Sequence, residues 1–177
     1  DVSDPASPAA IGSLGWADIG ESIQVVGGVA YVAAGDGGLL MIDVSDPDLP
    51  LLGTLATTPG YARDVEVLGA YAYVAADSSG LRMIDILDPT APVEDGHLDI
   101  PGESVNAVSV VPGIAYLATS SGLRTVDVSD QTTPGVMGSL DIPDGVNDVV
   151  VVGGIAYMAG VGGLFAVDII DPTAPSL

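Results

Sequence analysis

The sequence has no cysteine and no lysine among its 177 residues, and it has a single histidine, His97. The lack of cysteine excludes disulfides and thiol chemistry. The lack of lysine excludes the Gly-Lys-Ser/Thr loop that binds phosphate, and one histidine cannot form a His-Glu-x-x-His zinc motif. A Gly-x-Ser-x-Gly nucleophile motif is also missing, so the sequence predicts a protein that is not an enzyme.

Positive charge and long apolar runs are scarce as well. The chain carries 24 acidic residues against three arginines, which gives a net charge of -21. Such a charge repels nucleic acid and anionic membranes, and no apolar run is long enough for a membrane-spanning helix. We therefore expect no nucleic-acid partner and no membrane insertion. Other protein chains, and cations such as calcium, remain as expected partners.

What the sequence does contain is a repeat. The segment Gly80–Pro89 (GLRMIDILDP) recurs in related form from Gly38, Gly122 and Gly163. The aspartate that begins each Asp-x-x-Asp turn stands at position 1, 43, 85, 127 or 168, a spacing of 42, 42, 42 and 41 residues. A fixed period of this length is typical of repeat architectures.

Each repeat contains four short segments that alternate apolar and variable residues between turns, as in 64–68, 71–76, 81–86 and 93–98. This pattern predicts antiparallel strands and no helix. Four-stranded units of this length are typical of β-propeller blades. We therefore predict an all-β, β-propeller fold in a single domain, residues 1–177, with four blades at about 21–62, 63–103, 104–144 and 145–177.

The last predicted blade has no outer strand of its own. Residues 8–15 could supply it, and so could a neighbouring chain. However, Asp168–Leu177 repeats Asp1–Ala10, so both ends of the chain match the same place in a blade. Three alternatives remain: a four-bladed ring with one end displaced, part of a larger propeller, or a unit that completes its sheet from a neighbouring copy.

Two residue types recur at fixed places in the repeats. Tyrosines in the second strand are expected between neighbouring sheets, at Tyr31, Tyr73, Tyr116 and Tyr157. Glycines that open the third strand are expected to have positive φ, at Gly38, Gly80, Gly122 and Gly163. Glycines in the fourth strand predict a bulge or a close approach, at Gly12, Gly53, Gly96 and Gly138.

The Gly80–Pro89 segment, preceded by Ala-Tyr-Val-Ala, resembles the LVIVD repeat of bacterial and archaeal surface or secreted proteins. The resemblance covers almost the whole chain and recurs four times, although Gln131 stands where the other copies have proline. It implies a β-propeller and an extracellular or cell-surface location. The family offers no catalytic motif to carry over.

The Asp-x-x-Asp turns are the first candidate site. A propeller would place these carboxylates on one face, where calcium could bind them, because calcium prefers carboxylate and carbonyl oxygens. The alternative is a structural role, since aspartate before proline commonly accepts a backbone hydrogen bond in a turn. The candidate ligands are Asp43, Asp46, Asp85, Asp88, Asp127 and Asp130.

Polar residues before the first strand of each blade form the second candidate. In a propeller that strand lines the central channel, so these side chains would ring its mouth. They could serve an enzyme or ligand site, or border a channel filled only with water. They are Arg63, Asp64, Asn106, Asn147 and Asp148.

From these observations we expect a non-enzymatic extracellular or cell-surface module for protein interaction or assembly. Strand exchange at its ends would make it a homo-oligomer or polymer, as part of a larger propeller or a filament. The alternatives are a calcium-dependent binding module that uses the Asp-x-x-Asp turns, and an enzyme with its site at the channel mouth.

Overall fold

The computed structural model describes residues 13–15, 18–45, 51–55 and 60–177, which form four antiparallel sheets, here called blades 1 to 4. Blade 1 consists of β1 (Ser22–Val26), β2 (Val29–Ala33), β3 (Leu39–Asp43) and β4 (Leu51–Leu55). Blade 2 consists of β5 (Asp64–Leu68), β6 (Tyr71–Ala75), β7 (Leu81–Asp85) and β8 (Val93–Leu98). Blade 3 consists of β9 (Val105–Val111), β10 (Ile114–Thr119), β11 (Gly122–Asp127) and β12 (Gly135–Asp141). Blade 4 has only β13 (Val146–Val152), β14 (Ile155–Gly160) and β15 (Gly163–Asp168).

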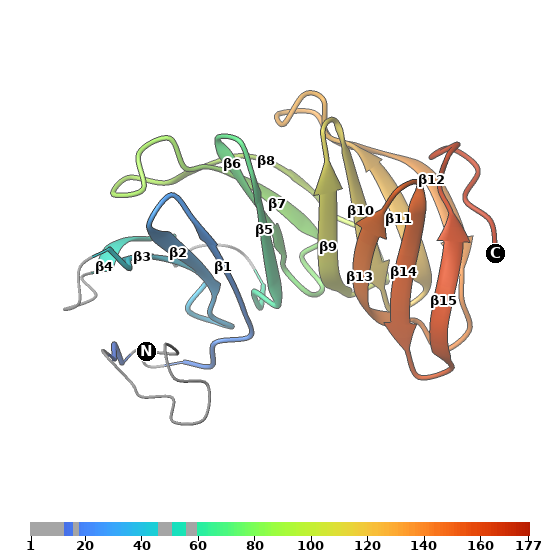
Figure 1. Cartoon of the computed structure of the whole chain (residues 1–177), viewed down its shortest axis with the longest axis horizontal. Coiled ribbons are helices and arrows are strands. Elements are labelled where there is room, and N and C mark those ends of the chain that lie inside the picture. Colours follow the sequence, from blue (N-terminus) through green and yellow to red (C-terminus); the bar gives the residue numbers. More distant parts are fainter. Residues whose placement is uncertain (1–12, 16–17, 46–50, 56–59) are drawn as a thin grey trace.

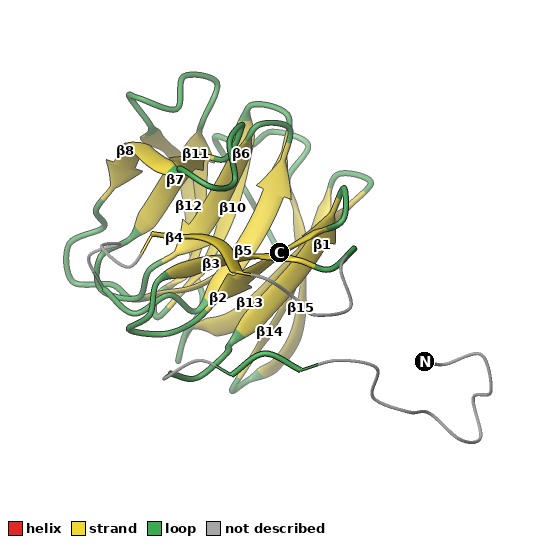
Figure 2. Cartoon of the chain, turned by 90° about the vertical axis from the view of Figure 1, so that its left-hand side faces the viewer, coloured by secondary structure: helices red, strands yellow, loops and turns green. Residues whose placement is uncertain are grey.

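The four blades follow one another in a curved row. Within each blade the strands lie side by side in chain order, and the first strands contact one another as β1–β5, β5–β9 and β9–β13. Blades 1 and 4 occupy opposite ends of the row (Figure 1), and β1 and β13 make no contact of comparable extent. Figure 2 shows the chain from the side of blade 1, with the strands of the blades in yellow and the loops between them in green. The predicted all-β fold of four propeller blades is confirmed.

Within the described ranges, no helix is long and apolar enough to cross a membrane.

The glycines that open the third strands have the conformation expected from the sequence. Their φ angles are positive at all four places, namely Gly38, Gly80, Gly122 and Gly163. At Gly80, with φ at +77°, a Cβ would also lie 2.0 Å from the Leu98 carbonyl oxygen. A side chain is therefore excluded there by backbone conformation and by the adjacent strand.

Each blade has a forward face, which packs on the following blade, and a rear face, which packs on the preceding one. Between blades 2 and 3, the forward face contributes Tyr73 and Leu81 to a buried cluster, and the rear face contributes Val108 and Leu117. The same places meet between blades 1 and 2 and between blades 3 and 4. Because three apolar layers are built alike, their tyrosines Tyr31, Tyr73 and Tyr116 are buried as predicted.

The glycines in the fourth strands allow the next blade to approach closely. A Cβ on Gly96 would lie 2.0 Å from the Gln131 carbonyl oxygen, which belongs to the turn after β11. Gly53 approaches the Pro89 carbonyl oxygen in the turn of blade 2 in the same way, and Gly138 approaches the Pro172 carbonyl oxygen in the turn of blade 4. The register of the third and fourth strands also shifts next to each of these glycines. Both predicted features are therefore present, while Gly12 lies outside the described residues.

Side chains on the forward faces also accept hydrogen bonds from the first strand of the next blade. Gln24 Oε1 accepts from the backbone N–H of Val67, and Glu66 Oε2 accepts from that of Val110 at 2.8 Å. Ser109 Oγ accepts from Val151 N–H at 3.3 Å. Gln24, Glu66 and Ser109 occupy equivalent positions in their repeats, so one place joins each pair of adjacent blades.

Glu66 should make stability depend on pH. Burial raises the pKa of its carboxyl above the ordinary 4.5, so folding favours the protonated form. The stability from this group is therefore complete below pH 4.5 and is lost as pH rises through the folded-state pKa. We expect Glu66→Gln, which copies Gln24, to raise the thermal midpoint at pH 7 and to lose this advantage near pH 4. Thermal melts across that range measure it, and an equal effect at both values would contradict the prediction.

Candidate functional site

Two of the five residues predicted to ring a channel mouth, Asp64 and Asn106, join neighbouring blades. Asp64 Oδ1 accepts a hydrogen bond from Ser22 Oγ at 2.6 Å, and its Oδ2 accepts from Val108 N–H at 2.9 Å. Asn106 Nδ2 donates to the Val146 carbonyl at 2.8 Å. These contacts connect blade 2 to both neighbours and blade 3 to blade 4, so they explain polar residues at this position without a substrate.

The other three predicted mouth residues do not converge on that group. Arg63 forms an ion pair with Asp77 at 3.1 Å, and its guanidinium lies 5.5 Å from the Tyr61 ring centroid. Asn147 and Asp148 are exposed on blade 4. An enzymatic site at this mouth stays a prediction.

The Asp-x-x-Asp carboxylates hold their own turns. Asp88 Oδ1 accepts from Thr90 N–H at 2.9 Å and from Thr90 Oγ1 at 2.6 Å. Asp130 and Thr132 repeat this arrangement at the same distances. These hydrogen bonds, with the hydroxyl first, lower the pKa of both carboxyls. The arrangement matches the structural role of an aspartate turn.

The remaining turn aspartates follow the same pattern where they are described. Asp43 and Asp127 Oδ1 accept from the N–H and hydroxyl of the serine two residues later, and Asp85 Oδ1 accepts from Leu87 N–H. Asp46 lies outside the described residues. Among those that are described, no three acidic or histidine side chains lie close enough together to hold a metal ion.

Calcium binding at these turns can be tested by thermal unfolding. We expect the same midpoint with calcium and with chelator, because one oxygen of each described carboxylate already accepts a hydrogen bond from its own turn, and no three such side chains converge among the described residues. Calcium needs six to eight oxygen ligands, and a bound ion at 100 times its Kd would add about 2.7 kcal/mol to the free energy of unfolding. A midpoint that rises with calcium concentration would establish a site.

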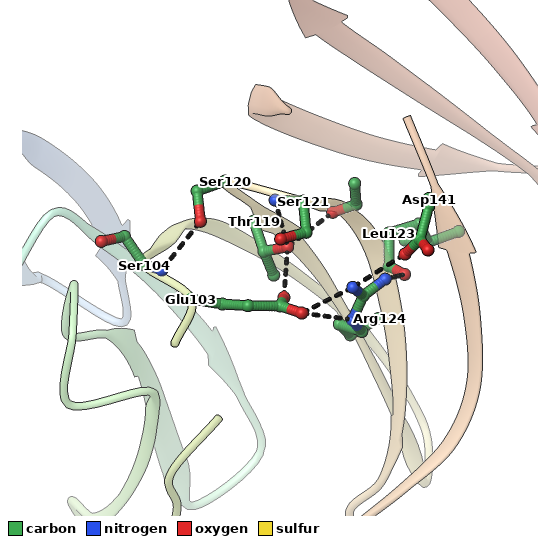
Figure 3. Close-up of polar contacts among 9 residues, drawn as sticks. Glu103, Ser104, Thr119, Ser120, Ser121, Leu123, Arg124 and Asp141 are labelled. Carbon is green, nitrogen blue, oxygen red and sulfur yellow. Dashed lines mark hydrogen bonds and ion pairs between the residues drawn. The ribbon is translucent and has the colours of Figure 1, made fainter. Parts of the chain in front are cut away.

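A buried arginine organises a polar cluster at the edge of blade 3 (Figure 3). The Arg124 side chain is mostly buried, and its Nη2 lies 2.6 Å from Glu103 Oε1 and 2.9 Å from Asp141 Oδ1. Glu103 Oε2 accepts in addition from Thr119 Oγ1 at 2.7 Å. The sequence reasoning missed this cluster. Because its charged groups bind one another, we assign it to the stability of blade 3.

The forward face of blade 4 is exposed, although it has the composition of a buried face. Leu164 is 75% exposed, whereas its equivalents Leu39, Leu81 and Leu123 have no exposed surface. Tyr157 is 39% exposed, so its predicted burial is wrong, because none of the described strands packs on this face. Val150, Ala159 and Ala166 share this face and are also exposed. This group of five residues is here called the open face.

The rear face of blade 1 is exposed at its first strand and, through Leu51 and Thr54, at its fourth strand. Ile23 is 64% exposed, whereas its equivalent Val65 in blade 2 is 4% exposed. At the second and third strands the same face is buried, and Leu14 packs against it. Leu98 and Leu140, which occupy the same position in their repeats, pack in the same way on blades 3 and 4. Leu14 therefore lies where the outer strand of a preceding blade would place it.

The third strand of blade 4 has a partly unpaired edge. Ser176 exchanges two backbone hydrogen bonds with Asp168, at 2.7 and 3.1 Å, and so begins a fourth strand. The sequence ends one residue later, at Leu177. The sequence had predicted an incomplete last blade. The two apolar faces were missed, although the repeat columns that contain Leu164 and Ile23 carried the signal.

Four-stranded sheets that repeat along the chain and pack face to face through their first strands define a β-propeller repeat protein. The LVIVD repeat matches residues 19–58, 59–99, 102–142 and 145–177. The chain therefore belongs to the LVIVD-repeat family. A comparison with curated proteins gave no match.

Two solved structures of designed proteins are similar to this chain. The crystal structure of the computationally designed Ika4 protein aligns with a TM-score of 0.71 and 11% identity, over 90% of this chain and 98% of Ika4. The computationally designed Ika8 protein aligns with a TM-score of 0.65 and 11% identity, over 82% of this chain and 44% of Ika8. At this identity the likeness concerns the fold alone.

Proposed function

We propose that this chain is a non-enzymatic module for protein interaction and assembly at the cell surface or outside the cell. One observation carries the proposal. Tyr157 and Leu164 of the open face are exposed, whereas the equivalent residues of blades 1 to 3 are buried at all three interfaces between adjacent blades. An exposed apolar patch built for face-to-face packing is typical of a protein interface. The extracellular location rests on the family resemblance.

The interaction is homo-oligomeric or polymeric in this proposal, because the two ends of the blade row offer matching surfaces. Contacts between unlike surfaces join copies head to tail and give closed rings or filaments. The high net charge opposes association between other parts of the surface. Apolar contact would therefore be confined to the ends.

The proposal is tested by the variant Leu164→Glu. Leu164 is largely exposed in the single chain, so a glutamate there should leave the fold intact. The same glutamate should abolish association, because the interface would bury its charge without a partner. The control is Ile170→Glu, since Ile170 is 81% exposed and its equivalent Leu87 remains 77% exposed inside the row. Light scattering should show an oligomer for the parent chain and the control, and a single-chain mass for Leu164→Glu. A parent chain of single-chain mass at all concentrations would contradict the proposal.

A further inference from the structure

The geometry points to a second copy of this chain as the occupant of the open face, bound so that its residues 13–14 extend the sheet of blade 4. This inference rests on the proposed function and names the partner and the register. Its basis is the three interfaces within the chain, which serve as templates for a fourth one.

The apolar surfaces match those templates. In each internal interface, a forward face with tyrosine and leucine packs on a rear face that includes valines of the next first strand. The open face supplies Tyr157 and Leu164, and blade 1 of a second copy supplies Ile23 and Val25, both exposed. The unmatched ends therefore fit each other by the contacts that already hold blades 1 to 4 together.

A polar contact at the same position supports the match. Asp148 Oδ1 accepts from Val149 N–H, as Asp64 Oδ1 accepts from Val65 N–H, both at 2.8 Å. In blade 2 the second oxygen, Asp64 Oδ2, accepts from Val108 N–H of the next blade. By equivalence, Asp148 Oδ2 accepts from the Ile23 N–H of the second copy.

The N-terminal segment is already placed for this contact. Leu14 lies on the rear face of its own blade 1, at the site of a preceding blade's outer strand. When a second copy docks its blade 4 there, β15 comes beside residues 13–14. In blades 2 and 3 the outer strand pairs leucine with leucine, as Leu81↔Leu98 and Leu123↔Leu140. That register places Leu14 opposite Leu164 and Ser13 opposite Phe165.

The two chain ends then share one strand without competing. Ser176 pairs with Asp168 at the beginning of the fourth strand, as Val93 pairs with Asp85 in blade 2. The positions farther along, opposite Leu164 and Phe165, accept residues 13–14 of the other copy. Strand addition of this kind satisfies an exposed sheet edge.

A second copy fits better than closure of one chain on itself. The three internal interfaces use equivalent residues, so each should turn the row by a similar amount. After three such turns, β1 and β13 are still separated by β5 and β9 (Figure 1). Further blades are therefore needed to close the row, and another copy supplies four of them.

Disulfide crosslinking tests the register, because the chain has no cysteine of its own. We mix the single variants Ser13→Cys and Phe165→Cys and oxidise them. Directly paired residues of antiparallel strands lie within disulfide reach, so we expect a crosslinked pair of chains that contains one of each variant. Leu14→Cys mixed with Leu164→Cys is a second pair, in case Phe165→Cys impairs folding. The control mixes Ser13→Cys with Ile170→Cys and should stay uncrosslinked.

The outcomes separate this inference from the proposed function. Association that depends on Leu164 but gives neither specific crosslink overturns the strand register and leaves the interaction module standing. A double variant, Ser13→Cys with Phe165→Cys, that forms only a disulfide within one chain shows a self-closed ring and overturns the second copy. A chain that never associates contradicts both.

Discussion

Glu103→Ala should lower the free energy of unfolding by about 3 kcal/mol, because the buried guanidinium of Arg124 loses its buried carboxylate partner. The Glu103 side chain is 14% exposed and binds Arg124 through both Nε and Nη2, at 3.1 and 2.6 Å. It also accepts from Thr119. Chemical denaturation monitored by circular dichroism measures the change.

Asp141→Ala is the matched control for this prediction. Asp141 binds the same Arg124 Nη2 at 2.9 Å, but its side chain is 84% exposed. Exposed ion pairs contribute less than about 1 kcal/mol, so the control should unfold almost like the parent. Equal losses in the two variants would show that burial does not govern this cluster.

Gly96→Ala should be comparably damaging, at about 3 kcal/mol, the upper end for an overpacked site. The added methyl group would meet the Gln131 carbonyl oxygen and the Thr132 Cα of the next blade. Because these are backbone atoms, relief requires blade 3 to move away from blade 2. The loss appears as a lower denaturation midpoint.

Gly135→Ala provides the control in the fourth strand of blade 3. No atom lies within 4 Å of a Cβ built on Gly135. Alanine also reduces the conformational freedom of the unfolded chain. We expect a change near zero or a small gain, and a loss as large as that of Gly96→Ala would point to a general cost of replacing strand glycines.

The blade architecture could be predicted from the sequence because the same pattern recurs in each repeat. Each copy gives the same alternation, and the tyrosine, the third-strand glycine and the fourth-strand glycine recur in register. The fourth-strand glycines also predicted contacts between blades, since a turn of the following blade packs closely against each of them, at Gly53, Gly96 and Gly138. Local patterns and packing therefore agree, as they do in sequences that specify one fold.

The candidate site was harder to predict from the sequence than the fold was, for a physical reason. An apolar residue such as Leu164 has the same sequence context as Leu81, and only the absence of a following blade exposes it. Likewise, Asp64 at a channel position proved to bind the backbone of the next blade, a long-range contact that its own repeat does not reveal.

The succession of forward and rear faces also governs how the chain unfolds. Each blade is held chiefly by its immediate neighbours, so stability behaves as a sum of blade terms and interface terms along one dimension. Within a single chain, the described strands give blades 2 and 3 two such interfaces each and blades 1 and 4 one each. Opening should therefore begin at either end and travel inward, with the central pair as the last cooperative unit to melt.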